Sequence, residues 1–227
     1  MMRPSGPHFF PLTLPFIIAF LAVLLLLVAL FEIGMLEYAY EKIGIGQRYI
    51  SLVLVLSLLG SFVNIPVARL PAEPVGTSEI VTFFGIQYVV PRLTEPGTIL
   101  AVNVGGAVIP TVLSMYLAVG NGIIGSAAIG VAVVALAAYA LARPIRGVGI
   151  VVPMFVPPVL AVLVARVLTE RSPAALAYIA GTLGTLIGGD LLNLGTLRSL
   201  GAPVASIGGA GTFDGIFLTG IVAVWLA

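Results

Sequence analysis

The sequence contains no cysteine and a single histidine, His8, close to its beginning. The absence of cysteine excludes disulfides, thiolate metal sites and a cysteine nucleophile. One histidine leaves neither a histidine-based metal site nor a Ser-His-Asp triad within one chain. We therefore expect no metal and no cofactor, and these absences remove several mechanisms that would compete with carboxyl-group chemistry.

Charge is equally scarce. Only 8% of the 227 residues are charged, 60% are hydrophobic and the mean hydropathy is +1.20, whereas a soluble domain carries about 25% charged residues. So little charge cannot cover a surface that faces water, so the composition predicts an integral membrane protein whose surroundings are the lipid bilayer. The net charge of +1 gives no reason to expect a nucleic-acid partner.

Long apolar runs predict an all-α polytopic bundle of about seven transmembrane helices, in one integral membrane domain over residues 1–227. The 27 glycines and 16 prolines indicate that several of these helices are broken and closely packed. The predicted spans are 9–31, 49–67, 98–119, 123–141, 147–167, 174–196 and 202–227.

Two stretches do not read as simple spans. Residues 79–93 are rich in β-branched and aromatic side chains with Gly85 in the middle, which favours a strand-like extramembrane segment or hairpin; an amphipathic surface helix is the alternative. Residues 202–215 are compatible with a helix, a loop or a re-entrant hairpin.

The basic residues indicate an orientation. Six lie on the side of the N-terminus and four on the other, which favours a cytoplasmic N-terminus. The six are Arg3, Arg69, Arg92, Arg143, Arg146 and Arg198, and the four are Lys42, Arg48, Arg166 and Arg171.

The only two aspartates, Asp190 and Asp214, lie in the last two predicted spans, one on each side of Arg198. Counted from that connection at about 1.5 Å per residue, both carboxyl groups lie roughly 12–18 Å below the same face. Sequential antiparallel helices usually pack side by side. We therefore expect the two carboxyl groups to meet near the bilayer midplane, where Gly188, Gly189 and Gly215 leave room for a close helix, a peptide or a water.

Two carboxyl groups within hydrogen-bond reach share a proton, since both cannot easily ionise. One then acts as the base for an attacking water and the other as the acid toward an amide carbonyl. The sequence does not assign the roles, because coupled groups titrate as a pair. Asn193, three residues after Asp190, would either orient that carboxyl group or contact a neighbouring helix.

The third predicted span contains Asn103, Gly105 and Gly106 shortly before Pro110. Paired glycines followed by proline predict an interrupted helix, and polar backbone at such a break could bind substrate. Asn103 is alternatively a hydrogen-bonding residue between helices.

Gly188-Gly189-Asp190 and Phe213-Asp214 resemble the paired motifs of GxGD-type intramembrane aspartyl proteases, the presenilin and signal-peptide-peptidase group. The resemblance implies cleavage of transmembrane segments or signal peptides by an Asp190/Asp214 dyad. The chain departs from the motif at Ile187, where glycine is expected, and at Phe213, which replaces tyrosine. The order of the two motifs is also reversed.

The runs GTLIGGDLLNL and SIGGAGTFDGIFLTG resemble an uncharacterised family of prokaryotic multi-pass membrane proteins that carries only a domain-of-unknown-function label. This second resemblance implies a prokaryotic plasma membrane and supplies no activity.

A small secondary transporter or ion-coupled carrier is the alternative function, because broken helices and membrane-buried carboxylates also mark transporters. A chain of this size would act as a carrier as a homo-oligomer. A third interpretation is a structural protein whose aspartates belong to a buried polar network.

Overall fold

The structure is a computed structural model of the whole chain. It describes residues 33–70, 80–83, 86–89, 98–145, 149–153, 155–199, 204–209 and 213–227. The predicted first span, 9–31, lies outside the described residues.

The chain divides into two compact units, Met1–Tyr38 and Ala39–Ala227. The described part of the first unit is helical. The single domain predicted over residues 1–227 stays a prediction.

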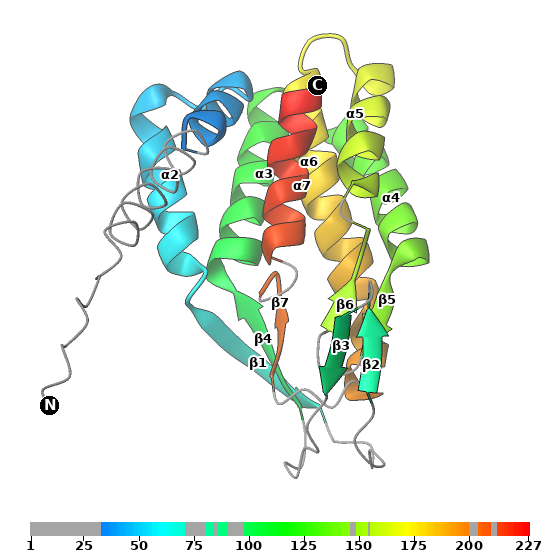
Figure 1. Cartoon of the computed structure of the whole chain (residues 1–227). Helices are drawn as coiled ribbons and strands as arrows, with labels where there is room; N and C mark the ends of the chain where they lie inside the picture. Colours follow the sequence, from blue (N-terminus) through cyan, green and yellow to red (C-terminus); the bar gives the residue numbers. More distant parts are fainter. Residues whose placement is uncertain are drawn as a thin grey trace, which may run out of the picture. The chain divides into compact units, whose positions relative to one another are not determined.

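The second unit is mostly helical in its described residues, with α6 at its centre (Figure 1). All of α6 except Pro173 and Leu183 is buried, because α3, α4, α5 and α7 pack around it. The helices are α2 (Gln47–Gly60), α3 (Ile109–Gly120), α4 (Ile124–Leu141), α5 (Val156–Leu168), α6 (Pro173–Thr185) and α7 (Phe213–Leu226).

Two of the described helices are long and apolar enough to cross a membrane, judged by length and composition alone. One is Ile124–Leu141. The other is Pro173–Thr196, which joins α6 to its π-helical and 3-10 continuation.

Short strands correct the expectation of an all-α chain. A three-stranded sheet has the order β1-β4-β7, in which β4 pairs antiparallel with β1 and parallel with β7. These strands replace parts of three predicted spans, because an apolar run reads alike as a buried strand or a helix. Their bounds are β1 (Asn64–Leu70), β4 (Thr98–Asn103) and β7 (Val204–Ile207).

The predicted hairpin within 79–93 is confirmed. β2 (Ile80–Phe83) and β3 (Ile86–Val89) pair antiparallel in a register that brings Phe83 opposite Ile86. A second pair of short antiparallel strands consists of β5 (Arg143–Ile145), between the predicted fourth and fifth spans, and β6 (Gly149–Val151), at the start of the fifth.

The prolines of the fifth predicted span mark a break, as expected. Pro153 lies between β6 and α5, whereas Pro157 and Pro158 lie in the first turn of α5. Proline is tolerated in that turn, because the N–H groups there have no partner within the helix.

Candidate functional site

Two π-helical turns interrupt the bundle, each around paired glycines. η1 (Val104–Val108) contains Gly105 and Gly106 and leads into α3, and η2 (Leu186–Asp190) contains Gly188 and Gly189 and follows α6. A π turn bonds residues five apart in place of four, and such turns often occur at functional sites. The break predicted in the third span therefore exists, with a strand before it.

Asp190 ends η2 and is buried, with 5% of its surface exposed. The backbone N–H of Gly208 donates a hydrogen bond of 2.8 Å to its Oδ2 atom. A buried carboxyl group needs such a donor, because its transfer from water is costly otherwise. The bond joins the end of α6 to the turn that follows β7.

Only glycine fits at position 208 without strain. Its φ of +68° lies in the left-handed region, and a Cβ atom there would lie 2.7 Å from the carbonyl carbon of Gly106. The turn after β7 therefore packs directly on η1 while its N–H holds Asp190. Gly208 is thus the contact that the two irregular helices share.

Asn103 holds η1 to the sheet and is 1% exposed. Its Oδ1 accepts from the Gly106 N–H at 2.8 Å, which caps the π turn. Its Nδ2 donates to the Ser61 carbonyl at 2.7 Å and to Asn64 Oδ1 at 3.1 Å. The hydrogen-bonding alternative for Asn103 is therefore confirmed, and contact with substrate stays a prediction.

The glycines serve close helix packing. A Cβ atom on Gly188 would lie 2.1 Å from the Ala135 carbonyl oxygen of α4, and one on Gly105 would lie 2.1 Å from the Ser57 carbonyl oxygen of α2. Asn193 donates from Nδ2 to the carbonyls of Gly188 at 2.8 Å and Gly189 at 3.1 Å. It thus satisfies backbone groups around the π turn.

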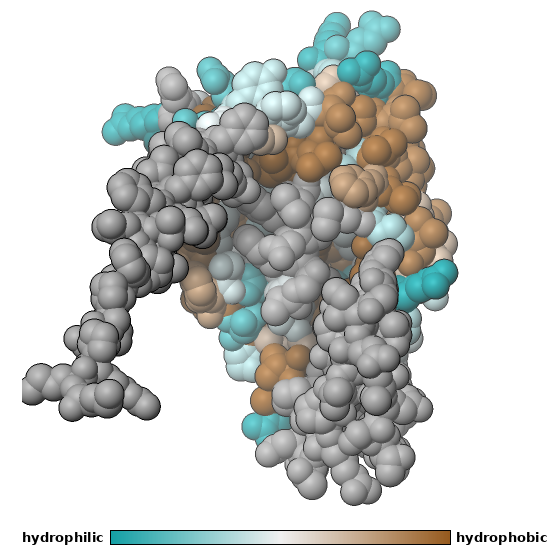
Figure 2. All heavy atoms as spheres, in the orientation of Figure 1, coloured by the Kyte–Doolittle hydropathy of each residue, from teal (hydrophilic) through white to brown (hydrophobic). Residues whose placement is uncertain are grey.

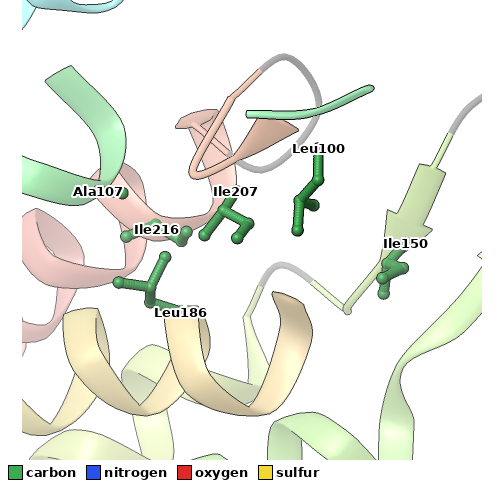
Figure 3. Close-up of a cluster of buried hydrophobic side chains, with 6 residues drawn as sticks. All are labelled: Leu100, Ala107, Ile150, Leu186, Ile207 and Ile216. Carbon is green, nitrogen blue, oxygen red and sulfur yellow. The ribbon is translucent and has the colours of Figure 1, made fainter. Parts of the chain in front are cut away.

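A cluster of buried apolar side chains brings η1, η2, α7 and the sheet together (Figure 3). Leu186, four residues before Asp190, and Ile216, two residues after Asp214, face each other within it. The other members are Leu100, Ala107, Ile150 and Ile207.

Asp214 lies in the first turn of α7, which begins at Phe213. The stretch 202–215 therefore holds a strand, a turn and the start of a helix. The structure describes the backbone of Phe213 and Asp214 but not their side chains. The pairing of Asp190 with Asp214 accordingly stays a prediction.

Two residues of this site, Gly208 and Ser206, were not expected from the sequence. Ser206 Oγ donates to Asn64 Oδ1, the same atom that Asn103 reaches, so these side chains tie β1, β4 and β7 together. The Gly208-Gly209 pair directly after Val204–Ile207 could have indicated a tight turn at this point. Among the described residues, no group of three or more acidic or histidine side chains could hold a metal ion.

The fold and the site define a mostly helical bundle in which a buried carboxyl group ends a π turn against a small mixed sheet. The chain belongs to the family described as protein of unknown function (DUF1614), which matches residues 58–226. The match spans α3 to α7, the sheet and both aspartates. No curated protein and no solved structure matches the chain.

Proposed function

We propose that the chain is an integral membrane protein of the prokaryotic plasma membrane, with about seven spans and a cytoplasmic N-terminus. Its helices support this, because their outward faces are apolar: Val112, Leu136 and Leu163 each expose more than half of their surface. Figure 2 shows apolar side chains over the upper right of the described surface, with hydrophilic ones at the top of the view and others lower down. Large exposed apolar patches of this kind mark membrane contact.

The distribution of charge supports the same proposal. Residues 98–142, which include α3 and α4, contain no charged side chain. β1 is exposed along most of its length and forms an edge of its sheet. Because lipid cannot satisfy an open strand edge, the sheet would lie at the headgroup level or against water. Resistance of the chain to alkaline extraction from membranes tests this; release into the soluble fraction would contradict it.

We further propose that the protein is an intramembrane aspartyl protease that cleaves transmembrane segments or signal peptides with an Asp190/Asp214 dyad. One observation carries the proposal: the buried Asp190 carboxyl group accepts a hydrogen bond from Gly208, in the segment that leads to Asp214. The shared cluster of Leu186 and Ile216 supports it further, because it brings η2, which ends at Asp190, close to the first part of α7. An aspartyl dyad needs two carboxyl groups on adjacent elements.

In this proposal one carboxylate removes a proton from water, whose oxygen attacks the amide carbon of the substrate. The other, protonated carboxyl group donates a hydrogen bond to the carbonyl oxygen, and the peptide C–N bond breaks as the nitrogen takes up a proton. The β2–β3 hairpin offers strand edges to which an unwound substrate segment could add as a further strand. Proline at Val81 or Val89 should then weaken cleavage.

The test uses the purified full chain in proteoliposomes with a transmembrane reporter peptide in water enriched in oxygen-18. Hydrolysis places one heavy oxygen in the new carboxyl terminus, which mass spectrometry detects. Asp190→Asn and Asp214→Asn should each abolish this product, whereas Glu170→Gln, in the turn between α5 and α6, should leave it unchanged. Hydroxyl-bearing transition-state mimics should also block the reaction.

If the two asparagine variants melt at the same temperature as the wild type, the loss of product reflects lost catalysis and not lost folding. Cleavage that persists in either variant would refute the dyad.

A small secondary transporter is the second candidate, because one π turn begins α3, a second follows α6, and the second ends at a buried carboxyl group. Interrupted helices are where transporters bind ions. This candidate predicts gradient-driven proton or sodium uptake into proteoliposomes, lost in Asp190→Asn, without any peptide cleavage.

A further inference from the structure

Among the described residues, three buried hydroxyl groups have no hydrogen-bond partner: those of Ser114, Thr182 and Thr185. All three are almost fully buried, with exposed fractions of 0%, 1% and 5%. An unpaired hydroxyl group is costly in an apolar interior. In native proteins such groups usually bind ordered water.

Two of the three hydroxyl groups belong to α6, and the third lies on a helix that packs against it. Tyr178, Thr182 and Thr185 follow one another at spacings of four and three residues, so they share a helix face. Ser114 belongs to the buried face of α3, which packs on α6. We call these four residues the hydroxyl seam.

α7 approaches the seam closely at Gly220. A Cβ atom there would lie 2.5 Å from Thr182 Oγ1, so glycine at this position keeps a side chain of α7 out of contact with the hydroxyl group. Neighbouring side chains on one helix face have Cβ atoms about 5–6 Å apart. That spacing exceeds a direct hydroxyl hydrogen bond of about 2.8 Å and suits one bridging water.

The seam extends in both directions. Asp190 lies five residues after Thr185 across the π turn, which is one turn further along the same element. At the other end, the Tyr40 hydroxyl group contacts those of Ser57 and Tyr178. The Tyr178 hydroxyl group lies near Thr182, but no hydrogen bond of normal geometry reaches the Thr182 oxygen.

We propose that the hydroxyl seam binds a chain of buried waters that connects Asp190 with the Tyr40 end of the bundle. Each hydroxyl group donates to or accepts from a water, and the last water reaches the carboxyl group. Asp190 would thereby exchange protons and water from the side opposite the sheet. The seam is a property of the fold and serves Asp190 equally in peptide hydrolysis or in ion transport.

The experiment measures magnetisation transfer from water to the full chain in lipid nanodiscs by NMR. Signals should reach the methyl groups of Thr182 and Thr185 and the amide of Gly208, which is bonded to Asp190. Val134 is the matched control, since it is fully buried and packs against the position of Gly184, between the two threonines. Transfer to the threonines and Gly208 no stronger than to Val134 would overturn the proposal.

Two variants test the seam through stability and require no resolved spectrum. Thr182→Val and Thr185→Val keep the shape of the side chain and remove the hydroxyl group. If water binds there, each variant should melt at a lower temperature than wild type, because the waters lose a partner. If the hydroxyl groups are dry and unpaired, both variants should melt higher, and that result would refute the seam.

Discussion

Replacing Gly188 by alanine should separate α4 from α6 next to Asp190. The new Cβ atom would lie 2.1 Å from the Ala135 carbonyl oxygen and 2.8 Å from the Ala138 side chain. Both neighbours belong to a helix whose buried face is built from small residues, so neither can turn aside. The overlap falls on backbone, and it can be relieved only by moving one helix.

The expected magnitude follows from two opposing terms. Overpacking of a well-filled interior costs about 1–3 kcal/mol, and contact with rigid backbone lies at the upper end. Alanine in place of glycine returns about 1 kcal/mol of helix propensity. We therefore expect Gly188→Ala to lower the free energy of unfolding by about 2 kcal/mol.

Gly195 supplies the matched control, because it follows in the same helical segment and a Cβ atom there would meet nothing within 4 Å. Gly195→Ala should be neutral or stabilise by up to about 1 kcal/mol. Both variants would be unfolded by denaturant in mixed micelles and followed by circular dichroism. Equal stability of the two variants would refute close α4–α6 packing as the role of Gly188.

Three further predictions concern the same region and its surroundings. Gly208→Ala should lower the free energy of unfolding by about 3 kcal/mol, whereas Gly122→Ala, which shares a positive φ but has open space, should cost only about 1. Asn103→Ala should cost about 3 kcal/mol, because the Gly106 N–H and the Ser61 carbonyl lose a buried partner; denaturant titration checks both. Burial raises the pKa of Tyr40 to about 12, above its ordinary value of about 10. Its contribution to stability should therefore be complete below pH 10 and decline between pH 10 and 12 in thermal melts, and Tyr40→Phe should reduce this decline.

The sequence predicts those parts of the fold whose signals are local. The β2–β3 hairpin follows from β-branched and aromatic residues on both sides of Gly85. α4 follows from an uncharged run rich in alanine and valine. α6 begins at Pro173, one residue before the start of the predicted span. Proline suits the first turn of a helix.

The three-stranded sheet could not be predicted, because its pairing joins distant segments. Ile99 pairs with Val204, and Asn64 pairs with Asn103. The strands are mostly apolar, and β4 runs directly into η1, so periodicity alone cannot separate the two structures. Pro66 was the one local hint, since proline in a strand indicates an edge or a bulge, and the register does shift beside it.

Several residues of the site could be predicted from the sequence, but their hydrogen bonds could not. Paired glycines before a proline indicated the interruption at η1, and the scarcity of charge selected Asp190, whereas the π turn at Gly188 and Gly189 was not foreseen. The roles of Asn103 and Asn193 depend on which carbonyl and amide groups a π turn leaves unpaired. Those groups are fixed by a hydrogen-bond shift that composition does not encode.

Gly208 contacts both π turns, η1 and η2. Its N–H binds the Asp190 carboxyl group, and its backbone packs against Gly106 of η1. A displacement of η1 would therefore move the turn after β7 and change the donor that Asp190 meets. Because β4 ends at Asn103 and η1 begins at the next residue, the position of the sheet is transmitted to the same turn. A substrate strand or an ion that shifted the sheet would thus alter the environment of Asp190 without contacting it.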